Sequence, residues 1–293
     1  MARFDFLCHY RDNPDLLRRI FELLDLAFPG LSLSDQERAA RPLGCRWEEI
    51  STPFVYRDGG RPVSHVGVLE IPMVLEGREV RAGGIHAVCT HPDFRGRGLY
   101  KTLMSEVMRW CEDRCQTLVL TTSQPFLYEP FGFRVMPECR FTGLLAGFPE
   151  GQGVRQLDFG RARDVALLRR VLSARAPVSL LLGIVREQAV FAFNETLRPL
   201  HYSDKLDVVL SLEIEGTTLL LFDVVGKKPP HLFEIVEMVP APIERVEVYF
   251  CPDQLGGDLT PESHILSGDD LLMVRGSFPL EGKPFMLPRS ARC

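Results

Sequence analysis

A short turn rich in glycine and arginine joins a strand-like segment to a helix-like one. The turn, Arg95–Gly98, follows the β-rich run Ile85–Thr90 and precedes the amphipathic run Leu99–Cys115. Glycines let the backbone approach a ligand closely, and the first turn of a helix offers unpaired N–H groups at the positive end of its dipole. The two arginines add positive charge. The turn therefore predicts a binding site for an anionic group such as a phosphate.

The spacing of this turn excludes two common phosphate-binding motifs. It lacks the Gly-Lys-Ser/Thr ending of a Walker A loop. It is not a dinucleotide fingerprint either, because no tight GxGxxG follows a first strand with an acidic residue about 20 positions further on. A lone RGxG also occurs by chance in many strand–helix loops, so its interpretation depends on the surrounding sequence.

Two motifs resemble the GNAT superfamily of N-acetyltransferases. The pyrophosphate loop of that family reads [RQ]-x-x-G-x-[GA]; Arg95–Tyr100 matches its first five positions, and Tyr100 replaces the small sixth residue. The Eis-like (enhanced intracellular survival) branch tolerates a bulky residue there. The segment Tyr128–Phe133, YEPFGF, also looks like the Y-x-x-F-G-[FY] motif of that branch. The resemblance is firm over residues 54–135.

This resemblance implies a fold, a cosubstrate and a reaction. The fold is α/β, with a mixed, splayed sheet. The cosubstrate is acetyl-CoA, whose acetyl group is transferred to a primary amine of an acceptor. In the family, the strand before the loop pairs with the pantetheine arm, the loop amides hold the pyrophosphate, and the end of the next strand touches the cosubstrate. The positions that match are Val88, Cys89, Thr90, Arg95, Gly96, Arg97, Gly98, Leu99, Tyr100, Lys101, Ser123 and Gln124.

Two residues are the predicted catalytic groups. Tyr128 matches the family tyrosine that protonates the departing thiolate, a task that suits a phenol with an ordinary pKa near 10; packing beside Phe131 and Phe133 is the alternative. The attacking amine must be neutral, which calls for a base. His86 would share a strand face with Val88 if alternation holds, and its ordinary pKa suits this role, although a single strand histidine is often structural.

Other groups compete for the role of base. Glu48 and Glu49 follow Trp47 in the region that usually borders the acceptor, and Glu129 neighbours Tyr128. In Eis-like enzymes the terminal carboxylate serves as base. Cys293 would have to supply it here, although the usual longer C-terminal domain is missing.

Hydrophobic periodicity predicts the elements that position these residues. An Asp-Gly turn at Asp58–Gly60 indicates a hairpin. The predicted elements of the first half are a strand Ala2–His9, a helix after Asn13, a helical stretch Arg38–Glu49, strands Phe54–Arg57, Val63–Ile71 and Ile85–Thr90, a helix Leu99–Cys115, a strand Leu118–Ser123 and a last strand near Arg134–Leu144.

The second half repeats the opening of the first at an offset of about 150 residues. DLLRRIF at 15–21 corresponds to ALLRRVL at 166–172, which indicates an internal duplication, with a chance match of amphipathic helices as the alternative. The breaker-rich segment Gly147–Gly153 is the predicted linker. We therefore expect a catalytic GNAT domain at residues 1–146 and a degenerate GNAT-like domain at residues 154–293.

The second domain is predicted to be degenerate because of its charges. Val246–Phe250 stands at roughly the place of a second cofactor strand. Asp253 and Asp258 follow it where the first half has arginines, and acids there would repel a pyrophosphate. A hairpin is also predicted from Val208–Ile214 and Thr217–Val225.

Composition limits the remaining classes of function. A net charge of −5 argues against a nucleic-acid partner. The eight cysteines include no CxxC pair, so no metal site is expected. No secretory signal is visible, and the longest apolar run, Val178–Val185, is far below the roughly 20 residues that span a membrane. We expect a cytoplasmic protein and leave a homo-oligomer open. A CoA-binding sensor without turnover and transfer of a longer acyl chain are the alternative functions.

Overall fold

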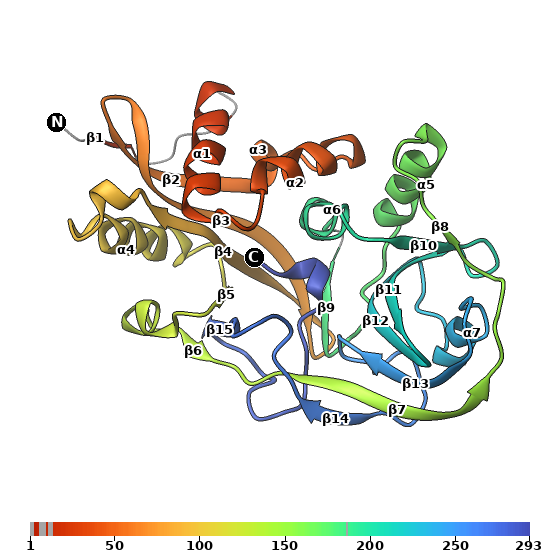
Figure 1. Ribbon diagram of the computed structural model, residues 1–293. Helices are drawn as coiled ribbons and strands as arrows, with labels where there is room; N and C mark the ends of the chain where they lie inside the picture. The colour runs from red at the N-terminus through yellow and green to blue at the C-terminus, as the bar shows by residue number, and fades with distance from the viewer. Residues whose placement is uncertain (1–2, 6–9, 11–13, 186) are drawn as a thin grey trace.

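Two mixed β-sheets lie side by side in the computed structural model, which describes residues 3–5, 10, 14–185 and 187–293 (Figure 1). Of the predicted first strand, only Arg3–Asp5 (β1) falls in this part of the chain, and Asn13 lies outside it. Among the described residues, no helix combines the length and the apolarity needed to cross a membrane. The described cysteines are free thiols.

The first sheet has the order β1-β2-β3-β4-β5-β15-β6, and β9 pairs with β3 outside this path. The β4/β5 pair is parallel, and the other neighbouring strands described in this sheet pair in antiparallel fashion. The predicted hairpin is confirmed as β2 and β3. The strands are β2 (Ser51–Asp58), β3 (Arg61–Leu75), β4 (Arg78–Thr90), β5 (Thr117–Thr122), β6 (Arg134–Val135), β9 (Leu182–Ile184) and β15 (Leu271–Gly276).

Helices cover both faces of this sheet because its strands carry apolar side chains on both faces. Phe54 on β2 packs in the cluster that contains α4, whereas the next residue, Val55, packs in the cluster that contains α1. This is the alternation that a strand imposes on successive side chains. The helices are α1 (Pro14–Ala27), α2 (Leu33–Ala40), α3 (Trp47–Ile50) and α4 (Leu99–Cys111), with a 3-10 turn at Arg41–Leu43.

The helical stretch predicted at Arg38–Glu49 begins earlier than expected. The α2 helix starts at Leu33, directly after Ser32 in a left-handed conformation. The helix then passes into the 3-10 turn, which ends at Gly44 with φ of 97°. Glycine adopts this φ without strain, so the chain reverses there before α3.

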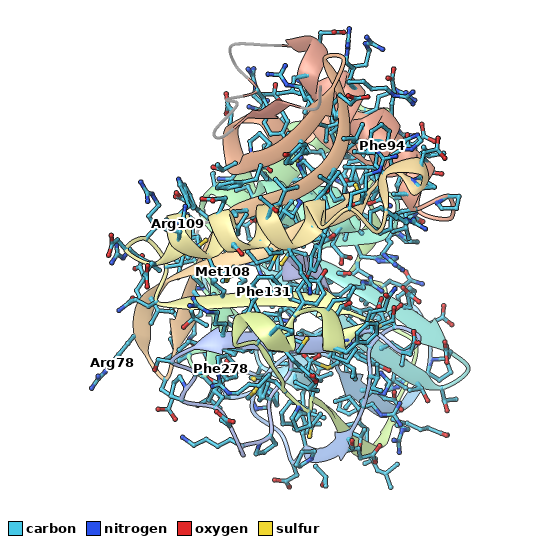
Figure 2. All side chains as sticks on the ribbon, turned by 90° about the vertical axis from the view of Figure 1, so that its left-hand side faces the viewer. Arg78, Phe94, Met108, Arg109, Phe131 and Phe278 are labelled. Atoms are coloured by element: carbon cyan, nitrogen blue, oxygen red, sulfur yellow. The ribbon has the colours of Figure 1, made fainter. Side chains whose placement is uncertain are left out.

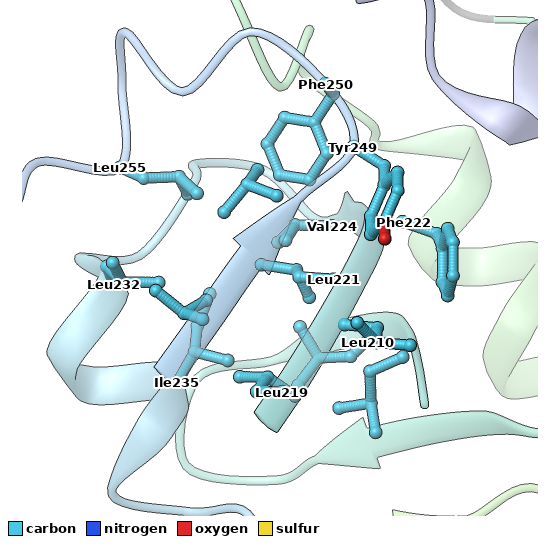
Figure 3. Packing of buried hydrophobic residues seen from close by; sticks show 14 of the residues in the cluster. Leu210, Leu219, Leu221, Phe222, Val224, Leu232, Ile235, Tyr249, Phe250 and Leu255 are labelled. Carbon is cyan, nitrogen blue, oxygen red and sulfur yellow. The ribbon is translucent and has the colours of Figure 1, made fainter. Parts of the chain in front are cut away.

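The second sheet has the order β14-β7-β13-β12-β11-β10-β8 and repeats the pattern of the first. Its parallel pair, β12/β13, takes the place of β4/β5. The predicted second hairpin is confirmed as β11 and β12. Figure 3 shows Leu219 and Leu221 of β12 packed with Leu232 and Ile235 of α7. The elements are β7 (Cys139–Phe148), β8 (Arg155–Gln156), α5 (Ala162–Ser173), α6 (Ala189–Glu195), β10 (Leu200–Ser203), β11 (Val208–Glu215), β12 (Thr218–Val225), α7 (Leu232–Val236), β13 (Ile243–Val248) and β14 (Thr260–Ser263).

The two sheets exchange strands across the predicted linker. The predicted strand Arg134–Leu144 is two strands: β6 stays in the first sheet, and β7 enters the second beside β13. In return β15, from the end of the chain, fills the place between β5 and β6. The domain boundary between residues 146 and 154 stays a prediction. Each sheet includes one strand from the other side of that boundary or next to it: β15 in the first sheet and β7 in the second.

Candidate active site

The parallel strands β4 and β5 pair over three residues and then separate. Ala82–Gly84 pairs with Thr117–Val119, and the pairing ends there. β4 continues to Thr90, paired with β3 alone. One backbone edge of Ile85–Thr90 therefore faces the gap between β4 and β5. The sheet is splayed, as the resemblance implied.

A cavity of about 1300 Å³ opens at this gap. The α4 helix packs on one face of the sheet, whereas α1 and Trp47 pack on the other, and the cavity has lining residues on both sides. It therefore crosses the sheet between the separated strands. Nine predicted site residues line it: His86, Val88, Cys89, Thr90, Arg95, Tyr100, Ser123, Gln124 and Tyr128.

The other predicted residues, Gly96, Arg97, Gly98, Leu99 and Lys101, form the adjoining loop and the start of α4. Gly96 and Gly98 have φ of 72° and 76°, and a Cβ added at either would meet no atom within 4 Å. The loop backbone is thus open to a ligand, with the first amides of α4 next to it. In Figure 2, Phe94 marks the loop and Arg109 the far end of α4.

The two arginines of the loop have different neighbours. Arg95 lines the cavity, and its Nε donates to the carbonyl of Thr90 at 3.3 Å. Arg97 donates from Nη2 to the carbonyl of Asp93 at 2.9 Å, and its guanidinium lies 4.7 Å from the centroid of the Phe94 ring. Both guanidiniums stay near the exposed loop, which gives it the positive charge expected from the sequence.

Tyr128 combines a buried ring with an unpaired hydroxyl. It is 7% exposed, and its ring lies 6.1 Å from those of Tyr100 and Phe133. No hydrogen bond of its hydroxyl is found among the residues that the structure describes, and Tyr128 lines the cavity. Burial raises the pKa of Tyr128 to about 12, so the phenol keeps its proton at neutral pH. Because Tyr128 lines the cavity, its hydroxyl is a candidate to meet a ligand there.

His86 lies on the opposite strand face from the one predicted. Val88 packs with the α4 cluster, whereas the His86 ring lies 4.8 Å from Trp47 on the α1 side. The cause is a bulge: the β3/β4 register shifts between His65 and Gly67, and Ala87 adopts φ of 52°. The expected alternation is therefore wrong at this point, although both residues line the cavity.

The imidazole of His86 is held tightly. Its Nε2 lies 2.9 Å from Ser51 Oγ, and a Cβ on Gly67 would come within 2.2 Å of the same nitrogen. Burial, together with nearby His65, lowers the pKa of His86 well below 6.5, so the ring is neutral at physiological pH.

A neighbouring histidine fixes the bulge, and sequence reasoning missed it. Nδ1 of His65 lies 2.7 Å from the carbonyl of Ala87 and must donate to it. Nε2 is then the acceptor for the hydroxyl of Tyr10, at 3.4 Å. Burial lowers the pKa of His65 to about 4, which keeps this tautomer neutral. No local sequence signal distinguishes this histidine from any other strand residue.

The end of the chain reaches the point where β4 and β5 separate, near Gly84 and Thr121. The Thr121 amide donates to the carbonyl of Cys293 at 3.1 Å, and Thr121 Oγ1 donates to the same oxygen at 2.6 Å. A Cβ on Gly84 would lie 2.6 Å from the Cys293 sulfur. Cys293 thus lines the cavity, whereas the alternative bases Glu48, Glu49 and Glu129 are not among its lining residues.

Asn194 of α6 holds this final segment in place. Its Nδ2 lies 3.3 Å, 3.2 Å and 2.9 Å from the carbonyls of Arg289, Ser290 and Arg292. Arg292 also pairs with Glu138 at 2.7 Å. The second half of the chain therefore builds part of the cavity wall, which the motifs did not indicate.

The equivalent gap in the second sheet is filled. β12 pairs with β13 through Leu221 and continues to Val225. The rings of Phe222 and Tyr249 stack there at 4.7 Å, as Figure 3 shows. The final segment covers them, because the Arg289 guanidinium lies 3.7 Å from the Phe222 ring and Ser290 donates to Asp223.

The predicted reason for this degeneracy is wrong. β13 is the counterpart of β5, so the loop after β12, Gly226–His231, corresponds to the first-half turn. That loop contains Lys227 and Lys228 rather than acids, and it also contains two prolines, which lack N–H groups. Asp253 and Asp258 follow the other strand. What closes the second gap is packed side chains and chain, not negative charge.

Comparisons with known proteins agree with this architecture. Residues 13–136 match the model of an acetyltransferase (GNAT) domain. A protein from Enterococcus faecalis V583 described as a probable N-acyltransferase shares the fold, with 13% identity and a TM-score of 0.59 over 94% of this chain and 72% of that one. Eis1 from Mycobacterium abscessus does so with 13% identity and a TM-score of 0.58 over 94% and 73%.

A GCN5-related N-acetyltransferase from Kribbella flavida is similar as well, with 16% identity and a TM-score of 0.55 over 94% of this chain and 70% of that one. A search of curated protein sequences gives no match. At these identities the likeness is one of fold, and it includes the Eis-like architecture that the motifs predicted.

Proposed function

We propose that this chain, whose residues 13–136 match the model of a GNAT acetyltransferase domain, transfers an acetyl group from acetyl-CoA to a primary amine. The observation that carries the proposal is the cavity at the splay. It brings a free strand edge, an open glycine loop at a helix N-terminus and an unpaired phenol together in one space.

The residues present fit acetyl-CoA in size and in chemistry. The open edge of Val88–Thr90 can pair with the amides of the pantetheine arm, as an added strand would. The backbone of Gly96–Lys101 and the Arg95 guanidinium can hold the pyrophosphate. Ser123 and Gln124, exposed at the end of β5, line the opposite side of the gap.

Acetyl-CoA supplies a thioester carbonyl, at which the C–N bond forms and the C–S bond breaks. The Tyr128 hydroxyl gives its proton to the departing sulfur, since its pKa near 12 keeps it protonated at neutral pH. The amine must enter neutral. After the C–N bond forms, its nitrogen loses one proton to solvent, and Tyr128 regains from solvent the proton that it gave to sulfur. His86, neutral and fixed by Ser51, accepts a hydrogen bond from the amine and orients it; its lowered pKa makes it a weak base on its own.

The test is release of free CoA from acetyl-CoA with a panel of amines, together with direct measurement of acetyl-CoA binding. Amine-dependent CoA release with acetyl-amine as the product supports the proposal. Binding without turnover would support a CoA-binding sensor instead. Failure to bind acetyl-CoA would remove the basis of the proposal.

A further inference from the structure

The acceptor side of the cavity is apolar. On the α1 side of the sheet the wall includes Phe21, Phe28 and Leu31 from α1 and the turn after it, Trp47 from α3, and Phe193 and Leu197 from α6 and its end; Gln36, Asn194 and Arg198 are its polar members. Trp47 forms the centre of this surface: its ring lies 4.7 Å from Phe193 and 5.9 Å from Phe21. Two lobes of the fold thus build one aromatic wall beside His86.

The apolar surface continues to the mouth of the cavity. Leu31 is 53% exposed and Leu197 is 60% exposed, yet both line the cavity. Large side chains left open at the rim of a cavity mark a surface that contacts an apolar ligand. A site for a strongly hydrated acceptor would be expected to carry polar groups at these positions instead.

The charged groups beside this wall are mainly positive, which disfavours an acceptor with several ammonium groups. Among the described lining residues the single carboxylate side chain is Asp270, which precedes β15 on the β5 side; the main-chain oxygen of Cys293, bound to Thr121, lies on that side too. Arg198, which follows α6, and Arg289 and Arg292, from the final segment that α6 holds, are positively charged lining residues. Two of these arginines already pair with carboxylates. Arg289 binds Glu195 and Glu213 at 3.0 Å each, and Arg198 lies 3.8 Å from Glu213, so these carboxylates have cationic partners.

We propose that the acceptor is a primary monoamine on an aryl or alkyl body, and that polyamines and aminoglycosides are poor substrates. The inference rests on the proposed function. A monoamine can enter neutral and bury its body against Trp47 and Phe193. A second ammonium on the same body would lose its hydration against this wall, where the described lining residues of α1, α3 and α6 offer no carboxylate; Asp270 lies on the β5 side.

A matched pair of acceptors tests this directly in the full chain with acetyl-CoA. Hexylamine and 1,6-diaminohexane differ by one ammonium group, and 2-phenylethylamine and spermidine extend the pair. We expect kcat/KM for CoA release to be at least about tenfold higher for hexylamine than for the diamine, as for the loss of one counter-charge.

Leu197→Glu supplies the missing carboxylate at the mouth. It should raise kcat/KM for the diamine relative to hexylamine by about tenfold, with KM for acetyl-CoA unchanged. Leu144→Glu is the matched control, because Leu144 is 82% exposed on β7 and does not line the cavity. It should leave the ratio of the two acceptors unchanged.

Equal or faster turnover of the diamine by the unaltered protein would overturn the inference while leaving amine acetylation in place. An unchanged ratio in a folded Leu197→Glu protein would also overturn it. If acetyl-CoA binds and neither class is acetylated, both the inference and the proposed function fail.

Discussion

Replacing Tyr128 by phenylalanine separates the chemical role of this residue from its role in packing. The ring lies within an apolar cluster with Tyr100 and Phe133, and that packing is retained by phenylalanine. The hydroxyl has no hydrogen-bond partner among the described residues, so its loss leaves no protein group unpaired there. The substitution therefore removes the proton and very little else.

Two magnitudes follow from this geometry. The free energy of unfolding should change by no more than about 0.5 kcal/mol, as for a substitution that breaks no contact. The rate should fall much more, because loss of a general acid costs typically 100- to 10,000-fold in kcat, or about 2.7–5.5 kcal/mol of activation free energy. Acetyl-CoA affinity should stay close to that of the unaltered protein.

Tyr100→Phe is the matched control in the same cavity. The Tyr100 hydroxyl donates to the carbonyl of Leu127 at 2.8 Å, and its ring lies 6.1 Å from that of Tyr128. Its removal should lower the free energy of unfolding by about 1 kcal/mol and leave kcat within a few-fold. The two variants should thus show opposite patterns of stability and rate.

The assay is steady-state kinetics with an amine that the panel identifies, alongside chemical unfolding and acetyl-CoA binding. A Tyr128→Phe protein with unaltered kcat would refute the reasoning, because solvent or another group would then protonate CoA. An equal loss of kcat in Tyr100→Phe would refute it too, since the effect would then come from packing.

Three further predictions concern the loop, the histidine and pH. Gly98→Asp should weaken acetyl-CoA binding at least about 100-fold, because it adds a negative charge at the open loop. Gly59→Asp is the control: Gly59 also has positive φ and open space but lies in the β2–β3 turn, so binding should not change. Isothermal titration compares the two variants. Gly67→Ala should displace His86, because the new Cβ would lie 2.2 Å from its Nε2, and should lower kcat/KM for the amine with acetyl-CoA affinity kept; Gly30→Ala, with no atom within 4 Å, should leave both unchanged. Activity should rise with pH as the amine loses its proton, and His86, whose pKa lies well below 6.5, should add no titration at neutral pH. Activity should not decline near pH 10, where a phenol of ordinary pKa ionises, because Tyr128 stays protonated up to its raised pKa of about 12. A decline centred at about pH 10 would contradict the burial of Tyr128.

Local signals in the sequence were sufficient for the loop and for most elements around it. The glycines at positions 96 and 98 and the helix after them act over a few residues, so composition and spacing identify them. The face of His86 was predicted wrongly because one residue with positive φ, Ala87, reverses the phase of the strand. That bulge depends on His65, which lies on another strand.

Long-range pairing is the part that the sequence does not reveal. Nothing within Leu271–Gly276 indicates that this strand inserts between β5 and β6, which lie far earlier in the chain. The sequence predicts the second cofactor strand at β13 instead of β12 for the same reason: it does not show which strands are neighbours. Hydrophobic patterns predict that a strand exists and which face it buries, but they do not specify its neighbour.

The final segment explains how a duplicated fold keeps one open site. Residues 286–290 lie over the gap of the second sheet, where Ser290 reaches Asp223 and Arg289 covers Phe222. Three residues further on, Cys293 reaches the apex of the first gap at Thr121. Because the same segment closes one gap and lines the other, the second lobe acts as a support for the first. Asn194, which binds three carbonyls of this segment, also stands on the helix that carries Phe193 to the acceptor wall. One short helix, α6, therefore both helps to hold the final segment and contributes to the acceptor wall.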